Sequence, residues 1–149
     1  MRKFFYNKFI IYSSIVIVAF LLDRVSKNYI LGFAEANGEV NIYINSFINL
    51  ILVWNNGIGF GLFPTDSVSY YNLFTILIVL INLIIIYMML NSDYLRGFIF
   101  SIILGGSFGN LFDRFYYSAV PDFIDLNYNN FHWFIFNVAD IFISIGITC

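Results

Sequence analysis

Long apolar runs alternate with short polar stretches along most of this chain. Four runs stand out, at about residues 9–22, 70–90, 97–112 and 131–148. A helix needs about 20 predominantly apolar residues to cross the hydrocarbon core of a bilayer, and the run at 70–90 meets that length most cleanly. The other runs are shorter, but bilayer thinning and packing against neighbouring helices can accommodate short spans. The pattern therefore predicts four transmembrane helices.

Between the first two runs the pattern changes its period. Residues 40–45 alternate apolar and polar side chains, and residues 50–54 form a second short apolar run. Alternation with a period of two is typical of a half-buried β-strand. Tyr43, Phe47 and Trp54 belong to this stretch, and amphipathic aromatic side chains collect at the membrane–water interface. We therefore expect a small β-structure that lies on the membrane.

Composition supports an integral membrane protein and argues against several other classes. Of the 149 residues, 60% are hydrophobic and 11% are charged, whereas soluble domains carry about 25% charged residues. We expect one integral-membrane domain over residues 1–149. The net charge is −2 and no basic stretch is present, so no nucleic-acid partner is expected. The chain has one cysteine and one histidine, which predicts neither an internal disulfide nor a metal site.

Basic residues beside the runs predict the orientation. Three of them precede the first run, and Arg96 lies between the second and third runs. Because basic residues favour the cytoplasmic side, residues 23–69 and 113–130 are expected to face outward. The basic start and first apolar run are similar to a signal peptide, but no small-residue cleavage site follows them. We therefore expect this segment to be retained as the first span.

Carboxylates lie at the ends of the apolar runs or inside them. Asp113 ends the third run, Asp140 interrupts the fourth, and Asp122 lies between them. A charged residue inside a span costs about 2.5–3.5 kcal/mol on insertion scales, so it suggests a functional site. Two carboxylates that share a proton can activate a water, one as base and the other as donor to a substrate carbonyl. Asp122 and Asp140 are candidates for such a pair. Taken singly, Asp122 is also consistent with a loop acid and Asp140 with a helix cap.

The third run carries a polar face. Gly106, Asn110 and Asp113 follow the spacing i, i+4, i+7 and share one side of a helix. Small residues let another helix approach closely, so packing alone is one interpretation of this face. Packing needs no charge, and the amide and carboxylate therefore favour a functional role. Arg114 follows directly, and its guanidinium suits a carboxylate, a lipid phosphate or a structural salt bridge.

Two further pairs lie about one helical turn apart. Asp23 and Lys27 are four residues apart with the acid first, which predicts either an ion pair at a helix end or part of an outer site. Asn137 and Asp140 share a helix face, so the amide can orient the carboxylate. Ser26 with Lys27 as its base is a weaker alternative, because adjacent side chains diverge by about 100° around a helix.

Five segments, in order along the chain, resemble the motifs of lipoprotein signal peptidase, the bacterial type II signal peptidase. They are Asp23-Arg24-Val25-Ser26-Lys27, Asn55-Asn56-Gly57-Ile58-Gly59-Phe60, Gly105 to Arg114, Val120-Pro121-Asp122-Phe123 and Phe136 to Asp140. Each segment alone is a weak signal, but their order and the four predicted spans make the set specific. Ile58-Gly59 stands where the family commonly has Ala-Ala, which bears on shape rather than chemistry.

The resemblance implies an all-α membrane protein with four transmembrane helices and a small extracytoplasmic β-cradle. It implies an aspartic endopeptidase of the bacterial cytoplasmic membrane whose active site faces the extracytoplasmic side. Such enzymes remove signal peptides from diacylglyceryl-modified prolipoproteins by cleaving just before the lipidated cysteine. The implied partners are this substrate, membrane lipid and a globomycin-type inhibitor, and no cofactor or metal is implied.

The resemblance also assigns roles to residues. The implied catalytic residues are Asp122 and Asp140. The implied supporting and substrate-binding residues are Asp23, Lys27, Asn55, Gly57, Asn110, Asp113, Arg114 and Asn137.

Two other functions remain open from the residues alone. Intramembrane Asp and Asn residues also form ion pathways, which fits a small proton-coupled transporter or channel subunit. The polar residues concentrate at the outer end, however, and the second run contains only Asn72 and Asn82 as amides. A non-enzymatic assembly factor that packs through the glycine face is the third interpretation.

Overall fold

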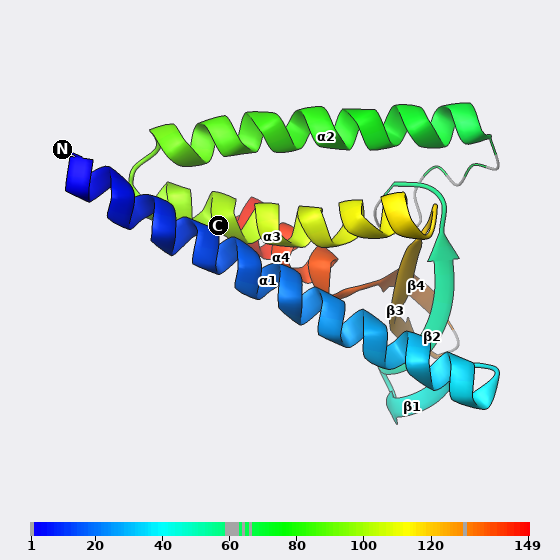
Figure 1. Cartoon of the computed structure of the whole chain (residues 1–149). Helices are drawn as coiled ribbons and strands as arrows, with labels where there is room; N and C mark the ends of the chain where they lie inside the picture. Colours follow the sequence, from blue (N-terminus) through cyan, green and yellow to red (C-terminus); the bar gives the residue numbers. More distant parts are fainter. Residues whose placement is uncertain (1, 59–62, 64, 66, 130) are drawn as a thin grey trace.

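The computed structural model describes residues 2–58, 63, 65, 67–129 and 131–149, with residues 2–6 described by their backbone alone (Figure 1). In chain order, the elements are α1 (Arg2–Asn37), β1 (Asn41–Asn45), β2 (Ile48–Asn55), α2 (Val68–Asn91), α3 (Tyr94–Tyr116), β3 (Val120–Tyr128), β4 (Phe131–Phe136) and α4 (Val138–Thr148). Gly59 and Phe60, from the second motif-like segment, lie outside the described residues.

Three helices of the described chain, α1, α2 and α3, are long and apolar enough to cross a membrane. They correspond to the first three predicted runs. Helix α1 continues well past residue 22, where its apolar run ends. Asp23 and Lys27 do not end the helix, because both side chains are fully buried and find partners inside the protein.

The fourth predicted run is only partly helical. Residues 131–136 form strand β4, and α4 has 11 residues, fewer than the about 20 needed for a span. The helix begins after Asn137 because this residue is extended and forms a capping box with Asp140. The preceding aromatic residues pair with β3 instead, as suits their strand preference. A helix over 131–148 is therefore wrong, and a fourth crossing stays a prediction.

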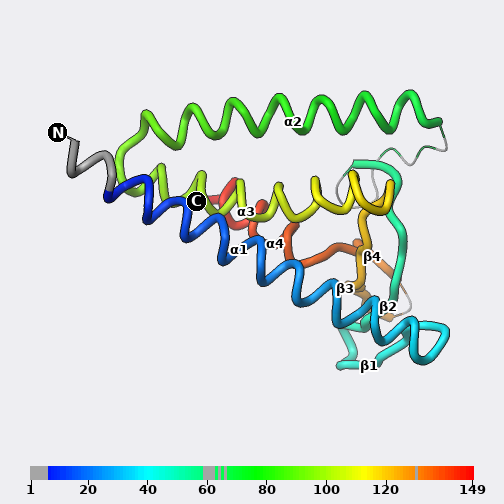
Figure 2. The backbone as a smooth tube through the Cα atoms, in the orientation of Figure 1, coloured from blue at the N-terminus to red at the C-terminus, as the bar shows by residue number. Residues whose placement is uncertain are grey.

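Helix α3 lies at the centre of the helices. Helices α1, α2 and α4 each pack against it (Figures 1 and 2). The predicted glycine face explains part of this packing. A Cβ on Gly105 would collide with Ala19 of α1, and one on Gly106 would collide with the carbonyl of Ala139 in α4. The packing interpretation of these glycines is therefore confirmed, and it brings α1 and α4 close to the polar residues of α3.

A four-stranded antiparallel sheet, in the order β1-β2-β3-β4, lies at one end of the helices (Figure 1). The β-structure expected around residues 40–54 is confirmed by β1 and β2. Strand β3 was not expected, because Asp122 looked like a loop acid. It forms because residues 120–128 have a pairing partner on each side, β2 and β4. Asp122 therefore belongs to a central strand.

The sheet and the helices meet through an apolar cluster. Three side chains are buried together: Ile30 of α1, Val40 just before β1, and Phe123 of β3. A second buried cluster, of Tyr12, Met89 and Leu104, joins α1, α2 and α3 nearer their other ends. The first cluster fixes β3 against the end of the helices where the polar residues gather.

Candidate active site

The two candidate catalytic carboxylates line the same cavity. Asp122 comes from β3 and Asp140 from the first turn of α4, and they are 2% and 3% exposed. The cavity has a volume of about 290 Å³. Its polar wall also includes Asn55, Asn110, Arg114 and Asn137, and its apolar wall includes Ile58, Ile78, Val120 and Ile143. The structure thus brings together six of the ten site residues predicted from the sequence around one space.

Each oxygen of the two carboxylates accepts a hydrogen bond from an uncharged group. Asp122 Oδ1 accepts from Asn137 Nδ2 at 2.5 Å, and Oδ2 accepts from Asn55 Nδ2 at 2.9 Å. Asp140 Oδ1 accepts from Asn110 Nδ2 at 2.8 Å, and Oδ2 accepts from the backbone N–H of Asn137 at 3.1 Å. Neutral donors fix both side chains without a direct ion pair, which leaves the two groups able to share a proton.

Burial first, and then the negative charge of Asp140, raise the pKa of Asp122 to about 7. The hydrogen bonds from Asn137 and Asn55 act in the opposite direction but do not outweigh burial. Because the two carboxylates influence each other, they titrate as a pair. A pair that holds one proton is in the state that acid–base catalysis by two carboxylates requires.

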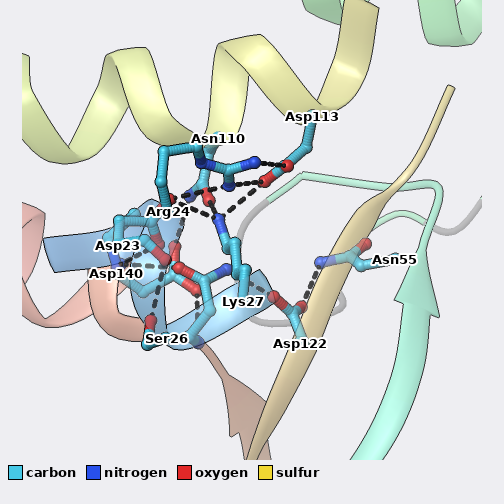
Figure 3. A network of polar contacts seen from close by, with 11 residues as sticks. Asp23, Arg24, Ser26, Lys27, Asn55, Asn110, Asp113, Asp122 and Asp140 are labelled. Atoms are coloured by element: carbon cyan, nitrogen blue, oxygen red, sulfur yellow. Dashed lines mark hydrogen bonds and ion pairs between the residues drawn. The ribbon is translucent and has the colours of Figure 1, made fainter. Parts of the chain in front are cut away.

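A buried charge cluster lies beside the pair (Figure 3). Lys27 Nζ contacts Asp23 Oδ2 at 3.0 Å, Asp113 Oδ2 at 2.7 Å and Asn110 Oδ1 at 2.7 Å. Asp23 Oδ1 also accepts from the backbone N–H of Ala139 at 3.0 Å. Asp23 and Lys27 therefore form more than an ion pair at a helix end, because they connect α1 to α3 and to the start of α4.

Arg114 is buried and does not form the salt bridge that its position beside Asp113 suggested. Its Nη2 donates to the carbonyl of Gly57, and its guanidinium lies over the ring of Tyr71, 5.3 Å from the ring centre. The N–H of Gly57 in turn donates to Asn55 Oδ1 at 2.8 Å. Arg114 thus ties the segment after β2 to α3, and Gly57 in that segment holds Asn55, which donates to Asp122.

Arg24 is a member of the charge cluster that the sequence analysis missed. Its Nη1 lies 2.6 Å from Asp113 Oδ1, and its Nη2 donates to Asp113 Oδ2 at 2.8 Å and to Asp23 Oδ2 at 2.9 Å. The motif-like segment gave no reason to select it, since it stands at a variable position. Charge balance could have identified it. The predicted site contains more carboxylates than cations, since only Lys27 and Arg114 are positively charged, and Arg24 supplies a further positive charge.

Two alternatives from the sequence lose support. The Ser26 hydroxyl donates to the backbone carbonyl of Asp23 at 2.8 Å, and Lys27 is held by two carboxylates, so they do not form a nucleophile and base. The only histidine, His132, lies with Nδ1 2.8 Å from Asp125 Oδ2 on the β3–β4 hairpin. Within the described residues, no group of three His, Cys, Asp or Glu side chains could hold a metal ion.

Known proteins similar to this chain fit the geometry. A family model described as signal peptidase (SPase) II matches residues 15–149. A protein from Pelagibacter ubique named lipoprotein signal peptidase is 52% identical over 149 residues, which cover 100% of this chain and 90% of the relative. The protein of the same name from Wigglesworthia glossinidia is 42% identical over 137 residues, covering 89% and 86% of the two chains.

Solved structures support the same assignment at the level of the fold. One described as a bacterial membrane enzyme has a TM-score of 0.73 and 25% identity, covering 92% of this chain and 82% of the other. A second with the same description has a TM-score of 0.74 and 23% identity, covering 92% and 87%. Together with three helices long enough to cross a membrane, these similarities indicate a multi-pass membrane protein. The sequence matches over nearly the whole chain show that it belongs to the signal peptidase II family.

Proposed function

We propose that this chain is a single integral-membrane domain that removes the signal peptide from prolipoproteins by aspartic-peptidase chemistry, with Asp122 and Asp140 as the catalytic pair. Membership of a protease family and relatives named lipoprotein signal peptidase support the reaction and its substrate. One observation carries the mechanism. Both carboxylates line one cavity, and every one of their oxygens is held by a neutral donor.

The proposed reaction uses a water bound between the two carboxylates. The ionised carboxylate takes a proton from the water as its oxygen attacks the scissile carbonyl carbon, and the protonated carboxylate donates to the carbonyl oxygen. The tetrahedral intermediate then collapses, the C–N bond breaks, and a proton passes to the leaving nitrogen. The products are a new carboxyl end on the signal peptide and a free amino group on the mature protein. No covalent enzyme intermediate forms.

The cavity suits a substrate that arrives from the bilayer. Its apolar wall includes Ile78 of α2 and Ile143 of α4, and its polar wall carries the catalytic pair. We propose that the signal helix docks along the apolar wall and that the substrate cysteine carries a diacylglyceryl group whose chains stay in the lipid. The sheet then lies over the extracytoplasmic surface of the bacterial cytoplasmic membrane, where its exposed aromatic residues, including Tyr43 and Trp133, contact the interface.

The transporter interpretation is not favoured. Among the described residues, the buried charged side chains gather around one end of the helices, where β3 and α4 begin, instead of lining the length of a span. The assembly-factor interpretation predicts that the two carboxylates are dispensable. The peptidase interpretation predicts the opposite, and it also predicts inhibition by globomycin and full activity in the presence of EDTA.

The test is cleavage of a diacylglyceryl-modified prolipoprotein by the purified protein. We expect the wild type to cleave, and Asp122→Asn and Asp140→Asn to lose activity by about 10²-fold or more, the usual effect of removing a general acid or base. Glu35→Gln is the matched control, because Glu35 is an exposed carboxylate at the far end of α1. Normal cleavage by folded variants would rule out the proposed pair, and no cleavage by the wild type would rule out the function.

A further inference from the structure

Arg24 balances the charge of a wider buried cluster, which joins the catalytic pair to the charged groups around it. This wider cluster contains four carboxylates, Asp23, Asp113, Asp122 and Asp140, and three cations, Arg24, Lys27 and Arg114. When the catalytic pair holds one proton, three negative charges face three positive ones. Without Arg24 the buried cluster would carry a net negative charge, which low-polarity surroundings disfavour. Protonation of a carboxylate is the simplest response to that imbalance.

We propose that Arg24 is a positioning residue that sets the pH range of the catalytic pair. This inference rests on the proposed function, because it concerns the same two carboxylates. Arg24 does not line the cavity, so it acts through the residues that it holds. Two routes lead from it to Asp140, and the residues of the first, Asp113, Lys27 and Asn110, are labelled in Figure 3.

The first route runs through Lys27. Arg24 holds both oxygens of Asp113, so Lys27 need not neutralise that carboxylate alone. The Lys27 ammonium is then shared with Asn110, whose Oδ1 lies 2.7 Å from Nζ. That contact fixes the amide so that its Nδ2 donates to Asp140 Oδ1 at 2.8 Å. If Arg24 is removed, the ammonium is drawn toward Asp23 and Asp113 and its hold on Asn110 weakens.

The second route runs through the backbone of α4. Arg24 Nη2 donates to Asp23 Oδ2, while Asp23 Oδ1 accepts from the N–H of Ala139. Ala139 directly precedes Asp140, so the orientation of Asp23 positions the first turn of α4. One planar guanidinium serves both carboxylates because its N–H groups are held in a fixed fork. The centre of the Phe112 ring lies 4.9 Å from Arg24 Cζ, so this ring covers the guanidinium.

An ion pair that only stabilises the fold would also explain these contacts, and pH separates the two roles. The charged groups that act on the pair are Asp23 and Lys27 on α1 and Arg114 on α3, while Asp113 is held by Lys27. Loss of a nearby positive charge favours protonated carboxylates, so the pKa of Asp122 rises and the acidic limb of the activity profile moves to higher pH. A purely structural role would instead lower activity by the same factor at every pH.

The experiment measures kcat and KM for a diacylglyceryl-modified prolipoprotein between about pH 4.5 and 9, using full-length protein in lipid nanodiscs, with thermal unfolding in parallel. The variants are Arg24→Gln and Arg24→Lys. The matched control is Arg96→Gln, because Arg96 is an exposed arginine with a long ion pair at the other end of the helices. For Arg24→Gln we expect the acidic limb to move up by about half to one pH unit, the order of effect expected on losing one nearby, partly screened charge.

Arg24→Lys keeps the positive charge but loses the planar guanidinium that donates to Asp23 and Asp113 at the same time. We expect its acidic limb to lie close to that of the wild type, with kcat reduced several-fold and KM unchanged. A folded Arg24→Gln protein with an unshifted profile would overturn the inference while leaving the proposed function intact. If Arg24→Gln does not fold, the decision passes to Arg24→Met, a neutral side chain of similar length, for which an upward move of the acidic limb would support the inference and an unshifted profile would overturn it. No cleavage by the wild type would instead reject the proposed function, and this inference with it.

Discussion

Asn137 touches both members of the proposed catalytic pair and also starts α4. Its side-chain amide donates to Asp122, its backbone N–H donates to Asp140, and its Oδ1 accepts from the backbone N–H of Asp140. One residue therefore couples the position of a strand carboxylate to the N-terminus of a helix. Its role in capping and its role in holding Asp122 use different atoms, so substitution can separate them.

Replacing Asn137 with serine keeps an oxygen that can cap the helix but removes the amide donor to Asp122. We expect Asn137→Ser to retain stability to within about 1 kcal/mol, since serine and asparagine are similar N-caps, and to reduce kcat by tenfold or more. Thermal unfolding and cleavage kinetics measure the two effects. Asn137→Ala is the comparison, because it loses both functions and should also lose stability. Full activity of Asn137→Ser would show that the Asp122 contact is dispensable.

The raised pKa of Asp122 makes stability depend on pH. Between its ordinary pKa of 3.8 and about 7 the folded protein binds this proton more tightly than the unfolded chain, so stability is greatest at low pH and falls as pH rises through that window. We expect the wild-type melting temperature to fall more steeply from pH 4 to pH 7.5 than that of Asp122→Asn. Across this window the free energy of unfolding falls by at most about 1.4 kcal/mol for each rise of one in pH. If the melting temperatures of the wild type and Asp122→Asn changed in parallel with pH, the raised pKa of Asp122 would be contradicted.

Among the helices, the contact between α3 and α4 places Asp140. A Cβ at Gly106 would lie 2.5 Å from the carbonyl oxygen of Ala139, the residue before Asp140. That oxygen belongs to the backbone, so it cannot turn away as a flexible side chain would. The position of one of the two proposed catalytic carboxylates therefore depends on the absence of a side chain on another helix.

Gly106→Ala should push α4 away from α3 and displace Asp140. We expect kcat to fall by about 10²-fold, since small displacements of catalytic groups have effects of that size, together with a lower melting temperature. Gly32→Ala is the matched control, because no atom lies within 4 Å of a Cβ built there. It should leave activity unchanged and be neutral or stabilising. Equal effects of the two substitutions on activity would argue against this role for the α3–α4 contact.

Hydropathy was sufficient to predict α1, α2 and α3, and alternation was sufficient for β1 and β2. Hydropathy failed for residues 131–136, because an aromatic strand and an apolar helix are both apolar and a window average does not separate them. The capping box at Asn137 is visible in the sequence as Asn followed three residues later by Asp. The structure shows that this box marks the start of α4, so the box is the local signal that separates the strand from the helix.

The sequence predicted which residues gather around the cavity better than it predicted the contacts between them. The motif-like segments named Asp122, Asp140 and their amide partners because the segments are local. Arg24 was missed because its partner Asp113 lies 89 residues away in the sequence. Similarly, the sequence left the partner of Arg114 open, and the structure pairs it with Gly57, 57 residues away. Long-range pairing of charges is decided by helix packing, which no local pattern contains.

For the protein as a whole, the cavity wall formed by α2 and α4 has a kinetic consequence. A substrate that enters past Ile78 and Ile143 travels within the lipid, so encounters depend on the number of substrate molecules per area of membrane and not per volume of solution. Adding protein-free lipid that mixes with the reconstituted bilayer should therefore slow cleavage roughly in proportion below saturation, although the bulk concentrations of enzyme and substrate stay the same. An unchanged initial rate over a tenfold lipid excess would show that substrate arrives from water. In a cell, the same relation makes the surface density of unprocessed precursor the quantity that sets how fast this enzyme works.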